Sequence, residues 1–337
     1  MNNTLIFGDN IAGLQYLLDI GFRHKIDLIY IDPPFATGLS FTINNGRAST
    51  ISNTKNGTTA YEDKLKGEAF VESIKERLLL ARELLSPQGS LYLHTDYKIG
   101  HYLKVMMDEV FGIENFRNDI TRIKCNPKNF SRLGYGNIKD MILFYTKGKN
   151  AIWNEPYEPY TKEEIERLFP KTDDKGRRYT TVPIHAPGES TKRELFCGLL
   201  PPTGRHWRTD IQTLNEWNEQ GLIEWSANNN PRKKIYLDEK SGKRLQDIWQ
   251  YKDPLYPKYP TEKNLDLLKM IIATSSNIDS IVLDFYCGSG TTLEAAMNLG
   301  RKWIGIDASE VAISTVKQRL GLEDNDLFCN SYNMITL

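Results

Sequence analysis

Apolar positions near the start of the chain alternate between strand spacing and helix spacing. Residues 4–7 form a short apolar run, and residues 11–18 carry isoleucine and leucine at helical spacing. Residues 26–31 form a second apolar run, long enough for one buried strand. A strand, a helix and a strand within the first 35 residues predict a β-α-β unit, which is typical of a parallel sheet.

The same alternation continues to about residue 150 and resumes after residue 258. Helical stripes are predicted at 68–85, 102–110 (with Tyr102, Val105, Met106 and Val110), 268–272 and 291–299, and from about 308 to 320. Strands are predicted at 90–94, 118–124, 140–146, 280–284 and 302–306. The pattern therefore predicts an α/β fold with a doubly wound, mostly parallel sheet, built from both ends of the chain.

The alternation of helical and strand spacing stops between residues 36 and 67, where residues typical of turns and loops dominate. A loop of about thirty residues within a compact domain is commonly either functional or disordered. Because it directly follows the strand at 26–31, it is either a lid over a site or a surface insertion without a role.

The second interruption covers residues 151–258. Prolines break the α/β rhythm there, and five of the six tryptophans lie in it. Residues 171–210 hold eight Lys and Arg against five Asp and Glu, and residues 231–244 hold six against two. Basic residues interleaved with aromatics suit a nucleic-acid surface, although an ordinary solvated insertion has the same composition.

Length and composition set broad bounds. A chain of 337 residues predicts two domains, or one large domain with an insertion. Lys+Arg and Asp+Glu are equal at 43 each, so the net charge of the chain does not favour binding to nucleic acid or to a membrane. We expect no signal peptide, and no apolar run approaches the ~18 residues of a membrane span. The four cysteines are scattered, with no metal-binding spacing, which favours a reducing cytoplasm and no metal.

Candidate chemistry begins where the strand at 26–31 ends. Asp32-Pro33-Pro34-Phe35 follows it directly. Two prolines stop the strand, since neither can donate a ladder hydrogen bond. An acid and an aromatic are left on a stiff turn at a carboxyl end, where open α/β sheets bind ligands. A rigid loop with a solvated Asp and a core Phe explains the same four residues.

A second candidate site lies between the strand at 280–284 and the helix that follows. Gly288 and Gly290 allow close backbone approach to a ligand, and the helix N-terminus supplies free N–H donors. Asp307 ends the next strand, where an acid can accept hydrogen bonds from ribose hydroxyls. This unit is interpreted as a nucleoside-cofactor half-site. The spacing is not G-x-G-x-x-G, which disfavours a nicotinamide dinucleotide.

Taken together, the two motifs resemble those of the amino-group DNA methyltransferases. Asp32-Pro-Pro-Phe35 matches their (D/N/S)-P-P-(Y/F) motif, and Leu283-Asp-Phe-Tyr-Cys-Gly-Ser-Gly-Thr-Thr292 resembles their cofactor motif. The catalytic motif comes first, an order similar to that of the beta class. The resemblance covers roughly residues 4–147 and 203–320. Phe285 replaces a common proline and Tyr286 a common phenylalanine, so the turn is expected to be less rigid.

The resemblance implies S-adenosyl-L-methionine as cofactor, in a Rossmann-like methyltransferase fold with permuted motif order. The implied cofactor-binding residues are Asp9, Lys263, Asp284, Phe285, Tyr286, Gly288, Gly290, Thr291, Thr292 and Asp307. Asp9 would approach the adenine of the cofactor, but it also suits a helix N-cap. Lys263 would approach the methionine carboxylate, unless it is a surface lysine. His94 ends a strand near the site and is more consistent with a structural role.

The implied catalytic residues are Asp32, Pro33, Pro34 and Phe35. The Asp32 carboxylate and the Pro33 carbonyl would accept the two N–H protons of a base amine, and Phe35 would stack on a flipped base. Asp rather than Ser at position 32 favours N6 of adenine over N4 of cytosine. The alternatives are an N4-cytosine enzyme, an RNA or protein amine methyltransferase, and an inactive DNA-binding protein.

The resemblance also implies a division of the chain. Residues 1–150 and 259–325 would form the catalytic core, 151–258 a target-recognition region and 326–337 a C-terminal tail, with 36–67 as a mobile loop over the base. The residues expected to bind DNA are Arg205, Arg208, Arg232, Lys233 and Lys234. Expected partners are double-stranded DNA, a cognate restriction endonuclease and a second copy of the chain, with no membrane association.

Overall fold

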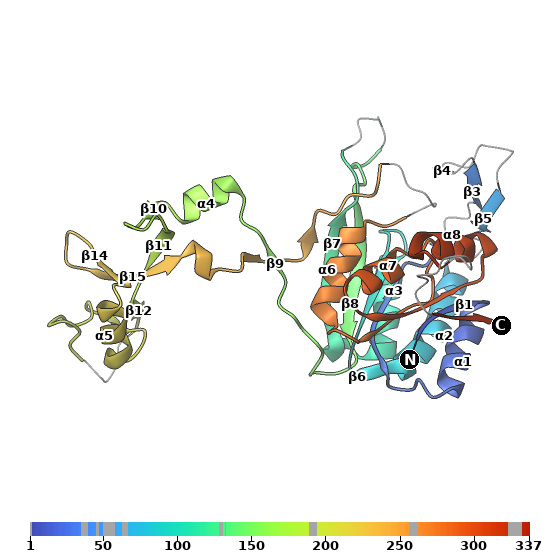
Figure 1. Cartoon of the computed structure of the whole chain (residues 1–337), viewed down its shortest axis with the longest axis horizontal. Coiled ribbons are helices and arrows are strands. Elements are labelled where there is room, and N and C mark those ends of the chain that lie inside the picture. Colours follow the sequence, from blue (N-terminus) through green and yellow to red (C-terminus); the bar gives the residue numbers. More distant parts are fainter. Residues whose placement is uncertain are drawn as a thin grey trace. The chain divides into compact units, whose positions relative to one another are not determined.

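The structure, a computed structural model, divides the chain into two units (Figure 1). It describes residues 2–34, 40–44, 47–49, 58–62, 67–127, 131, 133–188, 194–255, 262–322 and 332–337. Unit 1 comprises Met1–Pro156 and Gln246–Leu337, and unit 2 comprises Tyr157–Leu245. The expected region of 151–258 is therefore too wide, because residues 151–156 and 246–255 belong to unit 1.

Unit 1 is built on a nine-stranded sheet in the order β17-β7-β8-β6-β2-β18-β19-β1-β20. Its strands are β1 (Asn3–Phe7), β2 (Ile26–Ile31), β6 (Leu85–Thr95), β7 (Phe116–Ile123), β8 (Lys139–Thr146), β17 (Ile248–Trp249), β18 (Ile281–Asp284), β19 (Lys302–Asp307) and β20 (Tyr332–Thr336). Pairings to β8 are antiparallel and the others are parallel. The mostly parallel sheet predicted from the sequence is confirmed.

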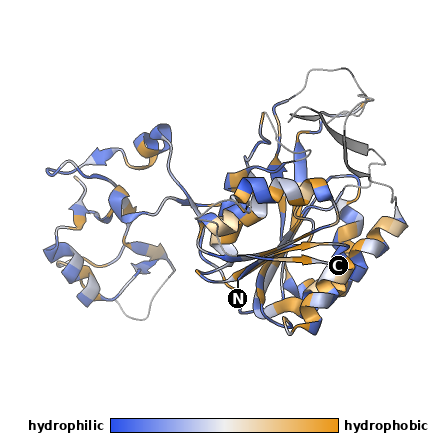
Figure 2. Cartoon of the chain, turned by 45° about the vertical axis from the view of Figure 1, so that its right-hand side comes forward, coloured by the Kyte–Doolittle hydropathy of each residue, from blue (hydrophilic) through white to orange (hydrophobic). Residues whose placement is uncertain are grey.

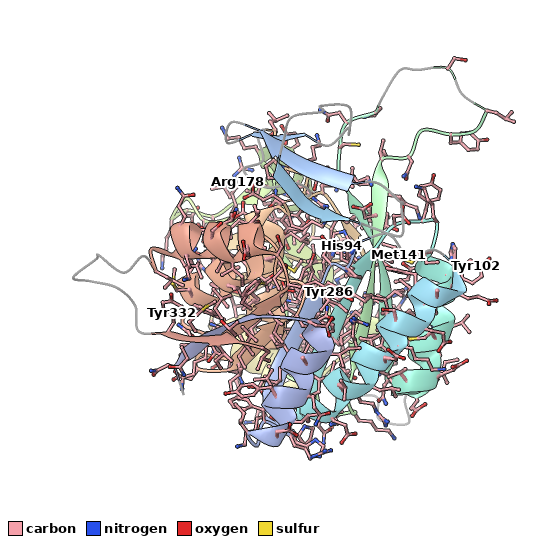
Figure 3. The ribbon with its side chains drawn as sticks, turned by 90° about the vertical axis from the view of Figure 1, so that its right-hand side faces the viewer. His94, Tyr102, Met141, Arg178, Tyr286 and Tyr332 are labelled. Atoms are coloured by element: carbon pink, nitrogen blue, oxygen red, sulfur yellow. The ribbon has the colours of Figure 1, made fainter. Side chains whose placement is uncertain are left out.

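Helices cover both faces of this sheet. They are α1 (Asn10–Asp19), α2 (Glu68–Leu84), α3 (Gly100–Phe111), α6 (Leu265–Ser275), α7 (Thr291–Asn298) and α8 (Glu310–Leu320). Figure 3 shows the first three on one side of the strands and the last three on the other. A 3-10 turn, η1 (Ile113–Asn115), follows α3. Among the helices of the described residues, none has the length and hydropathy needed to cross a bilayer.

The two covered faces explain the continuous apolar run of β2. Ile29 and Ile31 join the core formed with α1, α2 and α3, whereas Leu28 and Tyr30 are equally buried on the other face. Asp27 is the polar residue of the run, and its carboxylate accepts hydrogen bonds from Ser86 Oγ and the Ile281 backbone. Figure 2 shows the apolar residues concentrated in the sheet and its helices. A strand buried on both sides needs no polar alternation.

Three parts of unit 1 differ from the sequence predictions. On α3 the buried stripe is Leu103, Met106, Met107 and Val110, while Tyr102 and Val105 are 67% and 62% exposed. Residues 332–336, expected in a tail, form β20 beside β1. Residues 36–67 contain three short strands, β3 (Ser40–Asn44), β4 (Arg47–Ser49) and β5 (Thr58–Glu62), in a sheet of their own. The remainder of that loop, and with it the prediction of its mobility, lies outside the described residues.

Unit 2 is a small α/β unit with little apolar core. Its elements are β9 (Tyr157–Glu158), α4 (Lys162–Leu168), β10 (Lys171–Thr172), β11 (Arg178–Pro183), β12 (His185–Pro187), β13 (Arg205–Trp207), α5 (Ile211–Glu219), β14 (Ile223–Trp225), β15 (Pro231–Tyr236), η2 (Leu237–Glu239) and β16 (Lys243–Arg244). Strands β10, β11, β15 and β14 form one sheet. Trp207, Trp217 and Trp225 pack on a cluster that includes Phe196 and Leu214. These three tryptophans thus stabilise unit 2 itself.

Candidate active site

Four neighbouring parallel strands of unit 1 each lead into an acid at the same edge of the sheet. In the order β2, β18, β19 and β1, these acids are Asp32, Asp284, Asp307 and Asp9. The strands are linked in parallel register, with Leu283 opposite Ile29, Asp284 opposite Gly305 and Phe7 opposite Asp307. Sequence order reverses between β2 and β18, so the acids lie at the topological switch point where open α/β sheets bind ligands.

This arrangement joins the two sequence motifs. Neighbouring strands lie about 4.8 Å apart, so the residues after β2 and β18 are close although they come from opposite ends of the chain. Strand β1 pairs in parallel with β19, so Asp9 follows the strand next to the one that ends in Asp307. In Figure 3, His94 and Tyr286 mark this edge of the sheet.

One of the two carboxylate oxygens of Asp32 forms an ion pair. Its Oδ2 lies 2.5 Å from Lys263 Nζ, and both side chains are largely buried. Its Oδ1 is buried and has no hydrogen-bond partner among the described residues. A buried carboxylate oxygen without a donor is costly, so this atom is the acceptor that a ligand N–H would satisfy. Pro33 and Pro34 follow in the described backbone; Phe35 lies outside the described residues.

Backbone hydrogen bonds to the acids that end β18 and β19 fix the turn after β18. Asp284 Oδ1 accepts a hydrogen bond from the Tyr286 backbone, and Asp307 Oδ2 accepts one from the Gly288 backbone at 2.9 Å. Gly290 has φ of +80° and precedes α7, and a Cβ there would meet Val316 at 2.9 Å. Gly290 is therefore required both by its backbone conformation and by packing.

The remaining predicted residues of this turn are buried or packed against the core. Phe285 is 1% exposed and belongs to the core, while its carbonyl accepts a hydrogen bond from Asn10 Nδ2. Tyr286 packs at the edge of that core. Thr291 and Thr292 are buried in the first turn of α7, where Thr291 Oγ1 lies 3.3 Å from Arg319 Nη1. Their assignment to cofactor binding stays a prediction.

Asp9 is the N-cap of α1, which was the alternative role expected for it. Its Oδ1 accepts the Ile11 backbone N–H at 2.8 Å, which caps α1, and its Oδ2 lies 3.5 Å from Arg77 Nη2. Arg77 also donates to Asn10 and Ser73, and so fixes the first turn of α1 beside the site. Arg77 was not expected from the sequence, because only the packing of α1 against α2 brings it to the site.

A buried polar network is attached to β2 through Tyr30. Tyr30, two residues before Asp32, has its hydroxyl 2.7 Å from His94 Nδ1, and His94 Nε2 lies 3.3 Å from Asp140 Oδ2. Asp140 also contacts Lys124 at 2.6 Å and the fully buried Arg122 at 3.5 Å. Burial lowers the pKa of His94, which favours a neutral ring with a structural role.

The acids of the edge are electrostatically suited to a cationic ligand. Burial, together with the neighbouring Asp32 and Asp307, raises the pKa of Asp284 to about 7, although hydrogen bonds from Thr292 and Tyr286 act in the opposite direction. Burial also raises the pKa of Asp307. S-adenosylmethionine carries a positive sulfonium and an ammonium, whose charges favour ionised carboxylates. The acid row, the glycine turn and the helix N-terminus together fit this cofactor.

The raised pKa of Asp284 predicts a pH-dependent stability. An ordinary Asp loses its proton near pH 3.9, whereas folded Asp284 keeps it to about pH 7. The stability that Asp284 contributes is therefore fully present below the pKa of the unfolded state, and it is lost as pH rises through the pKa of the folded state. We expect the free energy of unfolding of Asp284→Asn, relative to the parent, to rise by about 2–3 kcal/mol between pH 5 and pH 7.5 in urea titrations without ligand. A difference in the free energy of unfolding between Asp284→Asn and the parent that did not change with pH would contradict the raised pKa of Asp284.

The five residues expected to bind DNA fall into two groups within unit 2. Arg205 and Arg208 are exposed around β13, where Arg205 Nη1 lies 3.1 Å from His185 Nδ1. The three of β15 are half-buried: Arg232 donates to the Thr181 carbonyl, Lys233 lies 3.3 Å above the Trp217 ring, and Lys234 lies near the Tyr179 ring. DNA binding by all five stays a prediction, and the exposed pair is the more accessible.

Comparison with known proteins agrees with the family resemblance of the two sequence motifs. A family model described as DNA methylase (N6_N4_Mtase) matches residues 26–318. Type II methyltransferase M.EcaI of Enterobacter cloacae is 40% identical, covering 95% of this chain and 70% of that protein. The type III restriction-modification enzyme StyLTI Mod subunit of Salmonella typhimurium is 25% identical over 89% of this chain and 50% of its own length. This chain thus spans only about half of that relative.

Two further relatives extend the comparison. DNA adenine methyltransferase YhdJ of Escherichia coli is 23% identical over 94% of this chain and 82% of its own. The solved structure of PvuII DNA methyltransferase (cytosine-N4-specific) has a TM-score of 0.52 at 13% identity, over 97% of this chain and 88% of the other, which shows the shared fold. On the family match and the M.EcaI identity, the chain belongs to the DNA methylase family, with S-adenosyl-L-methionine as its methyl donor.

Proposed function

We propose that the protein methylates the N6 amine of an adenine that is flipped out of a specific site in duplex DNA. The observation that carries the proposal is the buried Oδ1 of Asp32, which has no hydrogen-bond partner within the described part of the chain and lies at the edge shared with the cofactor motif. The Asp-Pro-Pro motif and the adenine-specific relative YhdJ favour adenine over cytosine. Mass spectrometry of DNA from cells that express the protein tests this directly: N4-methylcytosine without N6-methyladenine would overturn it.

The chemistry follows from the poor nucleophilicity of the target. The lone pair of an exocyclic base amine is delocalised into the ring, so the amine needs acceptors for its protons. Asp32 Oδ1 accepts one N–H, and the Pro33 carbonyl is proposed to accept the other, which favours a tetrahedral nitrogen with an available lone pair. The bound cofactor supplies the methyl group from its sulfonium. The contribution of the chain is therefore mainly positioning and electrostatics.

Lys263 is assigned by resemblance to the cofactor, but its ammonium pairs with Asp32 in the structure. We therefore expect Lys263→Met to lower kcat roughly tenfold, because Asp32 loses the contact that fixes its carboxylate plane. The KM for S-adenosylmethionine would change little, and Lys269→Met on α6 serves as a control. A raised KM for S-adenosylmethionine at unchanged kcat would instead support contact with the methionine carboxylate.

The partners follow from the same proposal. Unit 2 is proposed to read the target sequence, with Arg205 and Arg208 as its exposed cations. The Mod-subunit relative favours a role in a restriction-modification system with a cognate endonuclease, and we propose a homodimer acting in the cytoplasm. Single-molecule sequencing of DNA from expressing cells would report base, position and recognition site together. Co-purification with a nuclease and sedimentation of the purified protein test the two protein partners.

A further inference from the structure

Arg319 on α8 contacts four side chains from three parts of unit 1. Its Nη1 donates to Glu294 Oε2 at 3.0 Å and to Thr291 Oγ1 at 3.3 Å, both on α7. Its Nη2 lies 3.4 Å from Ser289 Oγ, in the turn after β18, and also donates to Glu262, in the segment before α6. A guanidinium carries five N–H donors in one plane, so a single Arg can join several partners. Arg319 therefore connects the turn of the cofactor motif to the segment before α6.

Residues 262–264 each make a defined side-chain contact. Glu262 pairs with Arg319, and both side chains are only 12% exposed. Lys263 pairs with Asp32, and these two side chains are also largely buried. Asn264 is the N-cap of α6, where its side chain accepts two backbone N–H groups of the first turn. Lys263 thus lies between two neighbours whose side chains are fixed, and its own ammonium contacts the catalytic carboxylate.

A purely structural role for Arg319 would be to join α8 to α7. The contact with Glu294 already provides that link, and ion pairs near the surface contribute little to stability. The contact with Glu262 needs a different explanation, because it fixes a residue outside any helix or strand, directly before the partner of Asp32. Reacting groups must be placed accurately, and a misplacement of about 1 Å can lower a rate about 10²-fold. A contact that controls the place of Lys263 therefore bears on the rate of the reaction.

We propose that Arg319 and Glu262 are positioning residues for methyl transfer: they keep Lys263 against Asp32, and so fix the catalytic carboxylate relative to the turn of the cofactor motif. The proposal rests on the proposed function, because it takes Asp32 as the acceptor of the amine proton. Neither Arg319 nor Glu262 contacts the target base in this scheme. Their effect on the rate passes through Lys263, which distinguishes positioning from a general contribution to the fold.

The first test is Glu262→Met, which removes one partner of Arg319 and leaves the other three in place. We expect kcat, at saturating DNA and S-adenosylmethionine, to fall about five- to tenfold, because Asp32 is then less well placed. The affinity for S-adenosylmethionine, measured by calorimetry without DNA, should change by less than about twofold. Glu262→Gln keeps an acceptor oxygen for Arg319 and should retain most of the parental kcat. A parental kcat in Glu262→Met would overturn the proposal.

A double-mutant cycle with Lys263→Met separates positioning from a structural role. In the Lys263→Met background, Glu262→Met should lower kcat by no more than about twofold, since the contact through which it acts is already gone. Arg319→Lys, which keeps the charge but loses the planar fork, should show the same dependence on Lys263, so the test does not rely on one variant. Equal losses of kcat in both backgrounds would overturn the proposal.

Hydrogen exchange of the protein without ligands gives a readout that is independent of activity. The backbone amides of residues 262–264 should exchange faster in Glu262→Met than in the parent, because the segment opens more often without its contact to α8. Exchange at the parental rate would show that Arg319 does not fix this segment, and would overturn the proposal.

The matched control is Glu294→Gln, which weakens the other carboxylate contact of Arg319 and leaves the segment before α6 unchanged. It should leave kcat within about twofold of the parent. A loss as large as that of Glu262→Met would assign the effect to α7 and overturn the role of Lys263. A folded parent protein that transfers no methyl group to DNA would instead refute the proposed function, whereas a parent that methylates adenine and shows no effect of Glu262→Met would refute only the positioning.

Discussion

Asp32→Asn is expected to lower kcat for DNA methylation by about 10²–10³-fold, in the range found when one preorganised electrostatic contact is removed from an active site. The variant keeps the size of the side chain but loses the negative charge of the buried Oδ1, the atom proposed to accept the amine proton. It also leaves Lys263 facing a neutral amide. Binding of S-adenosylmethionine, measured by calorimetry, should change far less, because the glycine turn and Asp307 remain.

The control for this result is Asp119→Asn. Asp119 is exposed on β7 of the same sheet, and its substitution changes the net charge equally without touching the edge that holds the acids. Thermal unfolding of both variants separates loss of chemistry from loss of folding. If Asp32→Asn methylated DNA at the parental rate with its fold intact, the amine-acceptor mechanism would be wrong.

The parts of the site that sequence predicted share one property: their residues are adjacent in the chain. Asp32 with its prolines, and Asp284 with its glycines, each carry the turn and the chemistry in a few residues. The expected β-α-β order then places both at one sheet edge, since parallel strands end together. The ion pair of Asp32 with Lys263 could not be predicted in this way, because it depends on how the segment before α6 packs.

The errors in the fold have similar physical causes. Strand β20 is short and half-exposed at the sheet edge, so it lacks the apolar run that identifies a buried strand. On α3, Tyr102 and Val105 share one helical face and Leu103 and Met107 another, and the sequence alone does not show which faces the sheet. Strand β6 begins at Leu85, five residues before the predicted start at residue 90, because Leu85 pairs with Ile26.

The buried charges near the site lead to the second large effect, on stability. Arg122 is fully buried in β7, and it contacts Asp140, the Tyr251 carbonyl at 2.7 Å and Asp253 at 2.5 Å. Replacing it by methionine keeps much of the volume but leaves Asp140, itself 3% exposed, with one fewer counter-charge. Breaking a buried pair by removing one partner typically costs about 3–5 kcal/mol, and we expect Arg122→Met to lose that much in urea unfolding.

Arg117→Met provides the matched control, because Arg117 lies on the same strand but is half-buried and bonds to Thr146 and Gly148. It should cost less than about 1 kcal/mol, as hydrogen bonds near solvent usually do. Adding Asp140→Asn to Arg122→Met should recover part of the loss, since the uncompensated carboxylate is then gone.

The pH dependence of the free energy of unfolding tests whether Asp140 is the source of the stability lost in Arg122→Met. Burial alone would raise the pKa of Asp140, but His94, Lys263 and Lys124 outweigh it and hold the pKa below its usual value. A depressed carboxyl pKa stabilises the fold above the unfolded value of about 3.9, and this contribution is lost gradually as pH falls from there through the lower pKa of the folded state. Protonation of Asp140 also removes its ion pair with Arg122, so the difference in unfolding free energy between the parent and Arg122→Met should narrow once the pH is low enough to protonate folded Asp140. If adding Asp140→Asn recovered none of the stability lost in Arg122→Met, the loss would come from packing around β7, with no part for the charge of Asp140.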